Sequence, residues 1–396
     1  MRALELTEGQ PPVSMRLADS EGVFLATSGI VTASPSLVQG EWLVAPTGKV
    51  GVARIGDVEI WIRPKLSIDR LIFLLGYARN PRGWQDVPVP VERAAELMTA
   101  LAYAFARQAE RAVQRGVLQG YRRTEEALPT LRGRLREADQ LRRRFGLPIP
   151  LEVVFDDFTV DIPENQLLRT AALRLLRLPR LHRSVRRSLQ RMATVTLDAV
   201  TVIDRSQPSP RWQPNRLNGA YHVALRLAEL VLAAESFEQR RGSVAVSGFL
   251  FDMPRVFEDF VCVALREALQ PHGGRVELQY RTHLDHGEQV AMRPDLAWLM
   301  NGQPIAVVDA KYKAEKPAGF PDADLYQMLA YCTALGLSEG HLVYARGNEV
   351  PARYVVRNAG VRIVCHALDL DAEPSALLAQ VAELAVGVAV GCTRPA

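Results

Sequence analysis

The segment of residues 293–313 combines acidic and basic side chains with two apolar runs. In its sequence, RPDLAWLMNGQPIAVVDAKYK, Asp295 precedes the first run, and Asp309 and Lys311 end the second. The Asn-Gly pair at 301–302, between the two runs, is typical of a tight β-hairpin turn. A hairpin places its strands side by side, and residues two apart leave the same face of a strand. The spacing therefore predicts that two carboxylates and one ammonium group lie close together.

Two carboxylates and an ammonium group at one place are suited to cleaving a phosphodiester. Carboxylate oxygens are hard ligands that suit Mg²⁺, and also Mn²⁺, better than zinc. A bound Mg²⁺ stabilises the charge that grows on the phosphate and activates the attacking water. The chain has five lysines against 43 arginines, and three of the five lie within residues 311–316. An ammonium is compact, whereas a guanidinium is planar and always protonated. The use of lysine at this place in an arginine-rich chain therefore indicates a chemical role for Lys311, such as orienting the water.

Lys313 leaves the same strand face as Lys311 if the strand continues that far. Two interpretations stay open for it, a contact with a DNA phosphate and plain solvation.

The elements that must position these residues change in type along the chain. Residues 1–75 are predicted to be β-rich, and residues 76–248 are largely helical, with apolar side chains at helical spacing. Residues 249–396 alternate between helices and strands. We therefore predict an α/β protein of the α+β multidomain type, in which the β-rich N-terminal domain, a helical middle domain and a C-terminal domain follow these boundaries.

The pair Pro294-Asp295, followed by Asp309-Ala310-Lys311 after an apolar strand, resembles the PD-(D/E)xK nuclease motif. The predicted order of helix, three strands, helix and strand is similar to the core of that superfamily. The resemblance implies a restriction-endonuclease-like fold for the C-terminal domain, with Asp295 and Asp309 as metal ligands and Lys311 as a catalytic residue.

The same resemblance implies further site residues on the two flanking helices. Glu258 stands where many members carry an extra metal-facing glutamate, although Asp259 beside it is a second candidate. Gln327 and Tyr331 form the QxxxY pattern of RecB-like members, and one helical turn places both on one face. The alternatives are a solvated glutamate and two half-buried helix residues.

Most of the chain resembles McrC, the nuclease subunit of McrBC-type, modification-dependent (type IV) restriction systems. The resemblance includes GVARIGDVEIWIRPKL near the N-terminus, LRGRLREADQLRR and FDDFTVDIPENQLL in the middle, and VFEDFV, RPDL, VVDAKYK and YQMLAY in the nuclease region. It implies Mg²⁺-dependent cleavage of double-stranded DNA that carries modified cytosine, such as 5-methylcytosine, in antiviral defence. It also implies a partner, an McrB-like AAA+ GTPase hexamer that McrC stimulates, with residues 1–75 as the motor-binding domain.

The chain itself has no GxxxxGK[ST] motif for binding nucleotide phosphates. The nearest string, APTGKVGV, lacks the first glycine at the required spacing and a Ser or Thr after Lys49. Nucleotide hydrolysis is therefore predicted to belong to a separate chain.

An arginine-rich segment in the helical middle is a second candidate for a contact with DNA phosphates or with an acidic partner surface. The alternative is a solvated helix whose arginines pair with Glu137 and Asp139. The arginines of this segment are Arg132, Arg134, Arg136, Arg142, Arg143 and Arg144.

Composition narrows the class of protein further. A net charge of +4 is weak support for nucleic-acid binding by itself. None of the four cysteines forms a CxxC pair, which excludes a zinc ribbon and an iron–sulfur signature. The N-terminus lacks an apolar signal segment, and the most apolar helical run, ALRLAELVLAA, is too short to span a bilayer. We expect a soluble, cytoplasmic protein without membrane contact.

Two other functions fit the sequence. One is a RecB-like repair exonuclease that works without a GTPase. The other is a non-enzymatic adaptor that activates an AAA+ ring and keeps the nuclease core only as structure.

Overall fold

The computed structural model describes residues 2–55, 58–79, 81, 97–204, 209–241, 244–312, 320–345 and 352–392. It forms two compact units, one from Met1–Val91 with Glu235–Ala396 and the other from Glu92–Ala234. The predicted α+β class is confirmed, because helices and several separate sheets make up the chain. One sequence prediction, the position of Lys313, lies outside the described residues.

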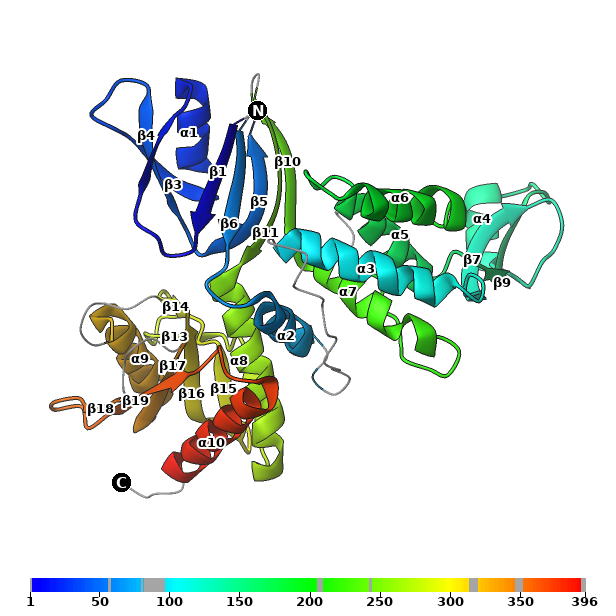
Figure 1. The fold of residues 1–396 in the computed structure, drawn as a ribbon. Coiled ribbons are helices and arrows are strands. Elements are labelled where there is room, and N and C mark those ends of the chain that lie inside the picture. Colours follow the sequence, from blue (N-terminus) through cyan, green and yellow to red (C-terminus); the bar gives the residue numbers. More distant parts are fainter. Residues whose placement is uncertain are drawn as a thin grey trace. The chain divides into compact units, whose positions relative to one another are not determined.

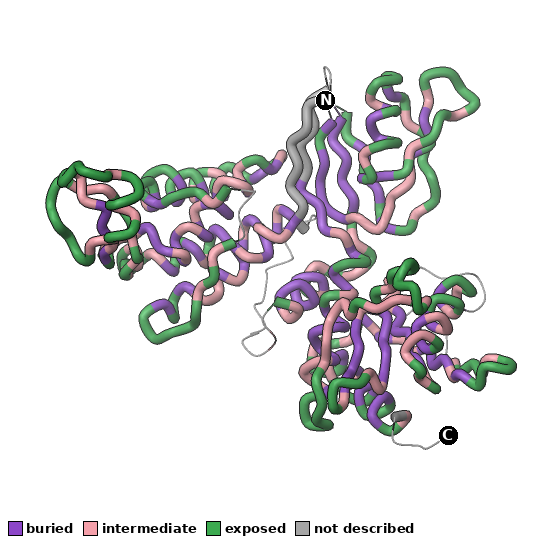
Figure 2. Tube along the Cα trace, turned by 180° about the vertical axis from the view of Figure 1, so that it is seen from behind, coloured by how far each residue is buried: buried purple, intermediate pink, exposed green. Residues whose placement is uncertain are grey.

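The first unit begins with a five-stranded sheet of order β1-β6-β5-β11-β10, in which only β1 and β6 are parallel (Figure 1). Gly51 of β5 allows a close approach to β11. Its φ is +132°, and an added Cβ would meet the carbonyl oxygen of Phe249 at 2.3 Å. Figure 2 shows β5 and β6 buried along most of their length. The strands are β1 (Arg2–Thr7), β5 (Lys49–Ile55), β6 (Val58–Arg63), β10 (Glu235–Arg241) and β11 (Val244–Asp252).

The sheet corrects the predicted boundary at 248. Residues 235–248, which the sequence placed in the helical middle, form β10 and half of β11 beside β5. The run VAVSGFLF is rich in β-branched and aromatic residues, which favour a strand, but the helical pattern just before it hid this change. By contact, the predicted first and third domains therefore belong to one unit.

A small sheet of order β2-β4-β3 and helix α1 complete the N-terminal part. Gly22 allows the helix to approach the sheet closely, because a Cβ there would collide with the ring of Trp42. The β-rich prediction missed this helix. The elements are β2 (Val13–Arg16), α1 (Asp19–Ser28), β3 (Val31–Pro35) and β4 (Glu41–Pro46), followed after β6 by α2 (Ile68–Arg79).

The C-terminal part of the same unit contains a six-stranded sheet of order β12-β15-β16-β17-β19-β18. The strands β12, β15 and β16 are antiparallel, whereas β16, β17 and β19 are parallel. The predicted hairpin and the alternation of helices and strands in this region are confirmed. The strands are β12 (Arg275–Leu278), β15 (Leu296–Met300), β16 (Gln303–Lys311), β17 (Glu339–Ala345), β18 (Ala352–Val355) and β19 (Arg362–Leu368), with a small ladder of β13 (Thr282–His283) and β14 (Ala291–Met292) between β12 and β15.

Three helices pack on this sheet. Helix α8 (Met253–Leu269) follows β11 directly and packs against α2, where Phe260 meets Phe73 at a ring distance of 5.6 Å. Helix α9 (Asp322–Leu335) shares a buried cluster with Val307 of β16, so this face of the strand points toward α9. Helix α10 (Pro374–Cys392) packs against α8.

Helix α10 is apolar enough over Pro374–Gly391 to cross a membrane by length and composition. One such helix is weak support for a membrane span, because a core helix passes the same test. Leu377 and Val388 on one side are fully buried, whereas Val386 on the other is half exposed. The sequence prediction singled out a different and shorter segment, ALRLAELVLAA, as the most apolar helix.

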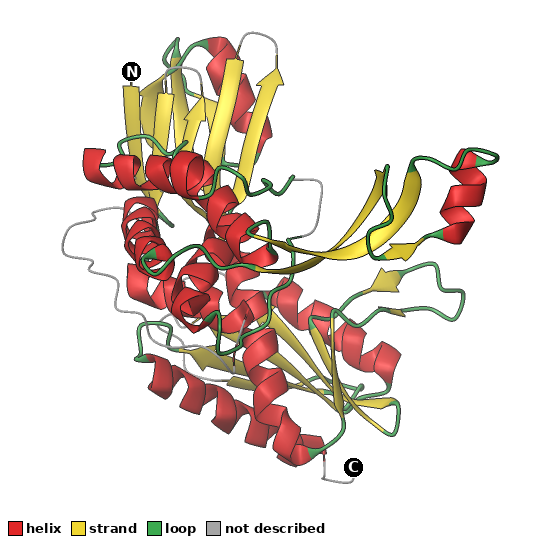
Figure 3. Cartoon of the chain, turned by 90° about the vertical axis from the view of Figure 1, so that its right-hand side faces the viewer, coloured by secondary structure: helices red, strands yellow, loops and turns green. Residues whose placement is uncertain are grey.

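The second unit joins a helical bundle to a three-stranded sheet of order β7-β9-β8. Figure 3 shows β7 and β9 as a long curved ribbon. The run PLEVVFDDFTVD, which interrupts the helices of this unit, contains strand β9. The elements are α3 (Leu97–Val113), β7 (Gly120–Leu128), β8 (Arg134–Leu135), α4 (Glu137–Arg144), β9 (Leu151–Thr159), α5 (Pro163–Leu175), α6 (Arg183–Arg191), the π-helical turn η3 (Met192–Thr196) and α7 (His222–Ala233), and short 3₁₀ turns lie at η4 (Gly219–Tyr221) and, in the first unit, η5 (Gln270–His272).

Two histidines in neighbouring parallel strands make folding sensitive to acid. Nδ1 of His341 lies 3.1 Å from Nε2 of His366. Burial lowers the pKa of His341 to about 3 and that of His366 to about 4. Because the unfolded chain binds these protons near pH 6.5, stability present above that pH is lost as the pH falls below it.

We predict that His341→Gln removes roughly 2 kcal/mol of the stability difference between pH 7 and pH 5. The measurement is the free energy of unfolding of wild type and variant at both pH values in urea. The control is His286→Gln, the same exchange at an exposed histidine, compared with the pH dependence of the wild type. A His341→Gln variant with that same dependence would show that this histidine does not govern the acid response.

Candidate active site

The β15–β16 hairpin brings the two predicted aspartates together. Its turn residues Asn301 and Gly302 have φ values of +52° and +81°, as a type I′ turn requires. Leu296 pairs with Val308, so Asp295 and Asp309 follow at the next register positions. The carboxylate of Asp295 accepts a hydrogen bond at 2.9 Å from the backbone N–H of Ala310, the residue between Asp309 and Lys311.

Lys311 connects this strand end to helix α9. Its Nζ lies 2.5 Å from Oδ2 of Asp309 and donates a hydrogen bond at 2.9 Å to Oε1 of Gln327. Nε2 of Gln327 in turn donates to the hydroxyl of Tyr331 at 2.7 Å. The structure therefore brings Gln327 and Tyr331 to the lysine, and the side chain of Lys311 is held between an acid and an amide.

Glu258 of α8 reaches the same place from another side of the sheet. The amide of Gln279 donates a short hydrogen bond to Glu258 and a second, 3.1 Å bond to Oδ1 of Asp295. Glu258 is half-buried, whereas Asp259 is exposed and is influenced by the charges of Arg255 and Arg79. Of the two candidates, Glu258 is the one that joins the cluster.

Burial and mutual repulsion dominate the electrostatics of the carboxylates. Burial raises the pKa of Asp295 to about 6, and burial with the charge of Asp295 raises the pKa of Asp309 to about 6. Burial and the charge of Asp259 raise the pKa of Glu258. Burial lowers the pKa of Lys311, but the Asp309 carboxylate outweighs it, so that the pKa lies above its ordinary value and the lysine stays protonated.

Two residues of this cluster were missed by the sequence prediction. Gln279 follows β12, and nothing in its local sequence marks it as a site residue. Asp324 of α9 is 3% exposed, accepts a hydrogen bond from Tyr344 and acts electrostatically on Lys311. Helical spacing could have found it, because Asp324 lies three residues before Gln327 on the same helix.

The carboxylate oxygens of Asp295, Asp309 and Glu258 suit a hard divalent cation, but the three carboxylates do not converge on one point. Within the ranges that the structure describes, no group of three or more His, Cys, Asp or Glu side chains is placed to hold a metal ion. Three carboxylates that raise one another's pKa are nevertheless the oxygen ligands Mg²⁺ prefers, and bound cation charge would relieve their repulsion.

The arginine-rich segment lies in the second unit, around β8 and α4, and most of its cations pair with acids of that unit. Pairs form with Asp139, as predicted, and also with Asp157, Glu125 and Glu152 from the adjacent strands. Only Arg134 among the six has no acidic partner in the described part of the chain. The arginines in such pairs are Arg132, Arg136, Arg142, Arg143 and Arg144.

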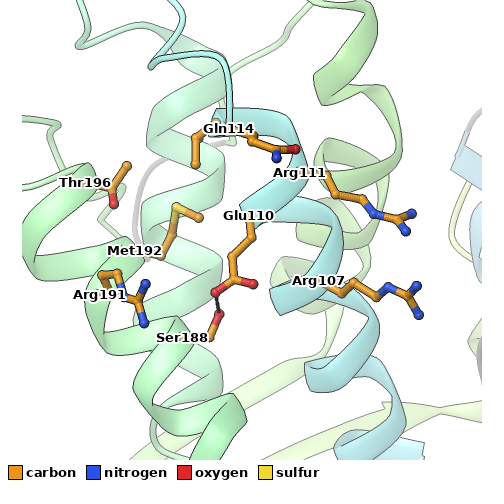
Figure 4. Close-up of a pocket in the computed structure, with 9 residues that line it drawn as sticks. Arg107, Glu110, Arg111, Gln114, Ser188, Arg191, Met192 and Thr196 are labelled. Carbon is orange, nitrogen blue, oxygen red and sulfur yellow. Dashed lines mark hydrogen bonds between the residues drawn. The ribbon is translucent and has the colours of Figure 1, made fainter.

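A pocket of about 490 Å³ in the second unit contains none of the predicted site residues. In Figure 4 Glu110 of α3 points toward Ser188 of α6, its hydrogen-bond partner at 2.5 Å, while Arg107 and Arg111 extend away from that pair. The sequence predicted no role for these residues.

The described residues thus form a mixed α/β protein in which strand ends gather carboxylates and one lysine. The family model described as McrBC 5-methylcytosine restriction system component matches residues 44–345. Because this match covers well over half of the chain, the chain belongs to that family, and the predicted resemblance to McrC is confirmed.

Comparison with solved structures finds a similar fold. A chain of the Thermococcus gammatolerans structure described as a refined half-complex from a tetradecameric assembly of McrB AAA+ hexamers with bound McrC matches with a TM-score of 0.54 and 17% identity, over 96% of this chain and 100% of that one. A chain of the cryo-EM structure of the Thermococcus gammatolerans McrBC complex matches with a TM-score of 0.37 and 19% identity, over 67% of this chain and 88% of that one. Among curated proteins, no match is found.

We predict that Asp295→Asn stabilises the metal-free protein by about 1 kcal/mol at pH 7.5. Neutralising one buried carboxylate relieves the repulsion between the acids. The asparagine offers only one amide oxygen, so it can accept from only one of the two groups that donate to Asp295, the N–H of Ala310 and the amide of Gln279. The measurement is thermal unfolding in a chelator. Asp285→Asn is the matched control and should destabilise, because hydrogen bonds from the backbone of Val290 and Gln289 lower the pKa of that carboxyl. A lower melting temperature for Asp295→Asn would contradict the repulsion.

Proposed function

We propose that this chain is the DNA-cleaving subunit of an McrBC-like, modification-dependent restriction system, acting in the cytoplasm. The observation that carries the proposal is the bonded cluster at the end of the β15–β16 hairpin, where Asp295, Asp309 and Lys311 meet. Its sequence pattern and its place on the sheet support a PD-(D/E)xK nuclease core. Family membership supports the restriction role.

In the proposed reaction, Asp295 and Asp309 hold Mg²⁺ or Mn²⁺, with Glu258 assisting. When bound, the ion supplies charge neutralisation at the scissile phosphate and a lower pKa for its water. Lys311, fixed between Asp309 and Gln327, presents an N–H to the attacking water or to the phosphate. Tyr331 keeps the amide of Gln327 oriented, so that its oxygen faces the lysine.

The substrate and partner follow from the family. We propose double-stranded DNA that carries modified cytosine as substrate and an McrB-like AAA+ GTPase hexamer as partner. The similar fold in a complex of McrB hexamers with bound McrC supports this pairing. The structure also offers no phosphate-binding loop at APTGKVGV, since Lys49 begins strand β5 and not a helix.

The site that contacts the motor is proposed to lie in the N-terminal strands, with the arginine-rich segment as the second candidate. Because β1, β5 and β6 share a sheet with β10 and β11, residues 1–75 are not separable from the rest of the unit. Point variants, and not a deletion, are therefore the way to map this contact.

The adaptor function remains a second candidate, because the carboxylates are not gathered into a metal site in the described residues. Cleavage decides between the two functions. A complex that cuts methylated plasmid only with the motor and GTP supports the restriction nuclease, whereas GTPase stimulation without cutting supports the adaptor. Cutting by the chain alone supports the exonuclease alternative.

We predict that Asp309→Ala abolishes single-turnover cleavage of a methylated plasmid by the assembled complex, and that Lys311→Arg lowers its rate about 100-fold. The larger, planar guanidinium does not fit between Asp309 and Gln327 as the ammonium does, and a 1 Å displacement of a positioned group costs on the order of 100-fold. Lys49→Arg, the same exchange on β5, should cut at the wild-type rate. Cleavage by Lys311→Arg at the wild-type rate would show that Lys311 supplies only diffuse positive charge.

A further inference from the structure

Gln279 holds two of the proposed metal-binding carboxylates at once. Its single Nε2 donates one hydrogen bond to Glu258 of α8 and another, at 3.1 Å, to Asp295 just before β15. An amide nitrogen has two hydrogens, so both of its donor positions serve carboxylates. The two acids come from elements that are far apart in the sequence, and the glutamine connects them.

The backbone of Gln279 is shaped for this contact. The β12–β15 ladder extends past its last pair, because the N–H of Gln279 donates to the carbonyl of Asp295 at 2.7 Å and that of Tyr280 to Pro294 at 3.0 Å. Gln279 has a φ of +52°, in the left-handed region that glutamine rarely adopts. Such a conformation persists where the surroundings fix it, and it often marks a functional site.

The side chain of Gln279 is a neutral amide, which suits it to orient two carboxylates without neutralising their charge. A lysine or arginine at 279 would neutralise the carboxylates and compete with a divalent cation for them. A glutamate would add a further negative charge where burial already raises carboxyl pKa values. An amide orients both acids and leaves their charge available.

We propose that Gln279 is a positioning residue that sets Glu258 and Asp295 for binding a divalent cation, an inference that rests on the proposed metal-dependent nuclease. Outer groups that orient metal ligands typically contribute 10- to 100-fold to metal affinity. The glutamine acts through the carboxylates and has no direct part in bond breaking.

A glycine at position 279 distinguishes an effect on cation binding from an effect on folding, because glycine tolerates the left-handed backbone. Gln279→Gly removes the amide and also relieves the backbone, since glycine accepts a φ of +52° readily. We expect the affinity for Mn²⁺, measured by calorimetry on the full chain, to fall about 10- to 100-fold. The melting temperature in a chelator should change little, because the relieved backbone offsets part of what the two lost hydrogen bonds contributed. Gln279→Asn keeps an amide that is one methylene shorter and should retain part of the affinity.

Glu288→Gly is the matched control, because Glu288 is exposed and has a φ of +55° away from the carboxylates. It should leave Mn²⁺ binding unchanged. If Gln279→Gly binds Mn²⁺ as tightly as wild type while Asp309→Ala loses binding, the positioning role is wrong and the metal site stands. A wild-type chain that binds no Mn²⁺ would overturn both this inference and the proposed metal-dependent nuclease.

Discussion

The confinement of three acids beside one lysine is the constraint on which the rest of the first unit depends. Asp309 is only 2% exposed, and Asp295 and Glu258 are half-buried. Burial raises the pKa of each, so the ionised cluster opposes folding. The fold must therefore supply enough stability elsewhere to hold the cluster in place.

That stability comes from apolar packing and from donors aimed at the acids. The strands β15 and β16 and the helix α8 bury large aliphatic and aromatic side chains around the site, Phe257 and Phe260 among them. The N–H of Ala310, the amide of Gln279 and the ammonium of Lys311 each meet a carboxylate. Groups fixed in this way are preorganised, which the proposed binding of a cation or phosphate would exploit.

Local pattern sufficed for the hairpin and for the helix that flanks it, because an Asn-Gly turn and one-turn spacing determine which side chains are neighbours. It did not suffice for Gln279, whose position depends on the pairing of β12 with β15 and on a left-handed backbone. The same limit applies to β11, which pairs with β5 from almost 200 residues away. Alternation within a strand indicates which face is buried, but it does not identify the distant strand that pairs with it.

A crystal structure of the full chain grown with Mn²⁺, with anomalous diffraction recorded at the manganese edge, tests the central claim most directly. We predict an anomalous peak within coordination distance of the carboxylates of Asp295 and Asp309, with Lys311 still bonded to Gln327. A structure with manganese in the medium and no peak at these carboxylates would contradict the assignment of the cluster as a metal-dependent active site.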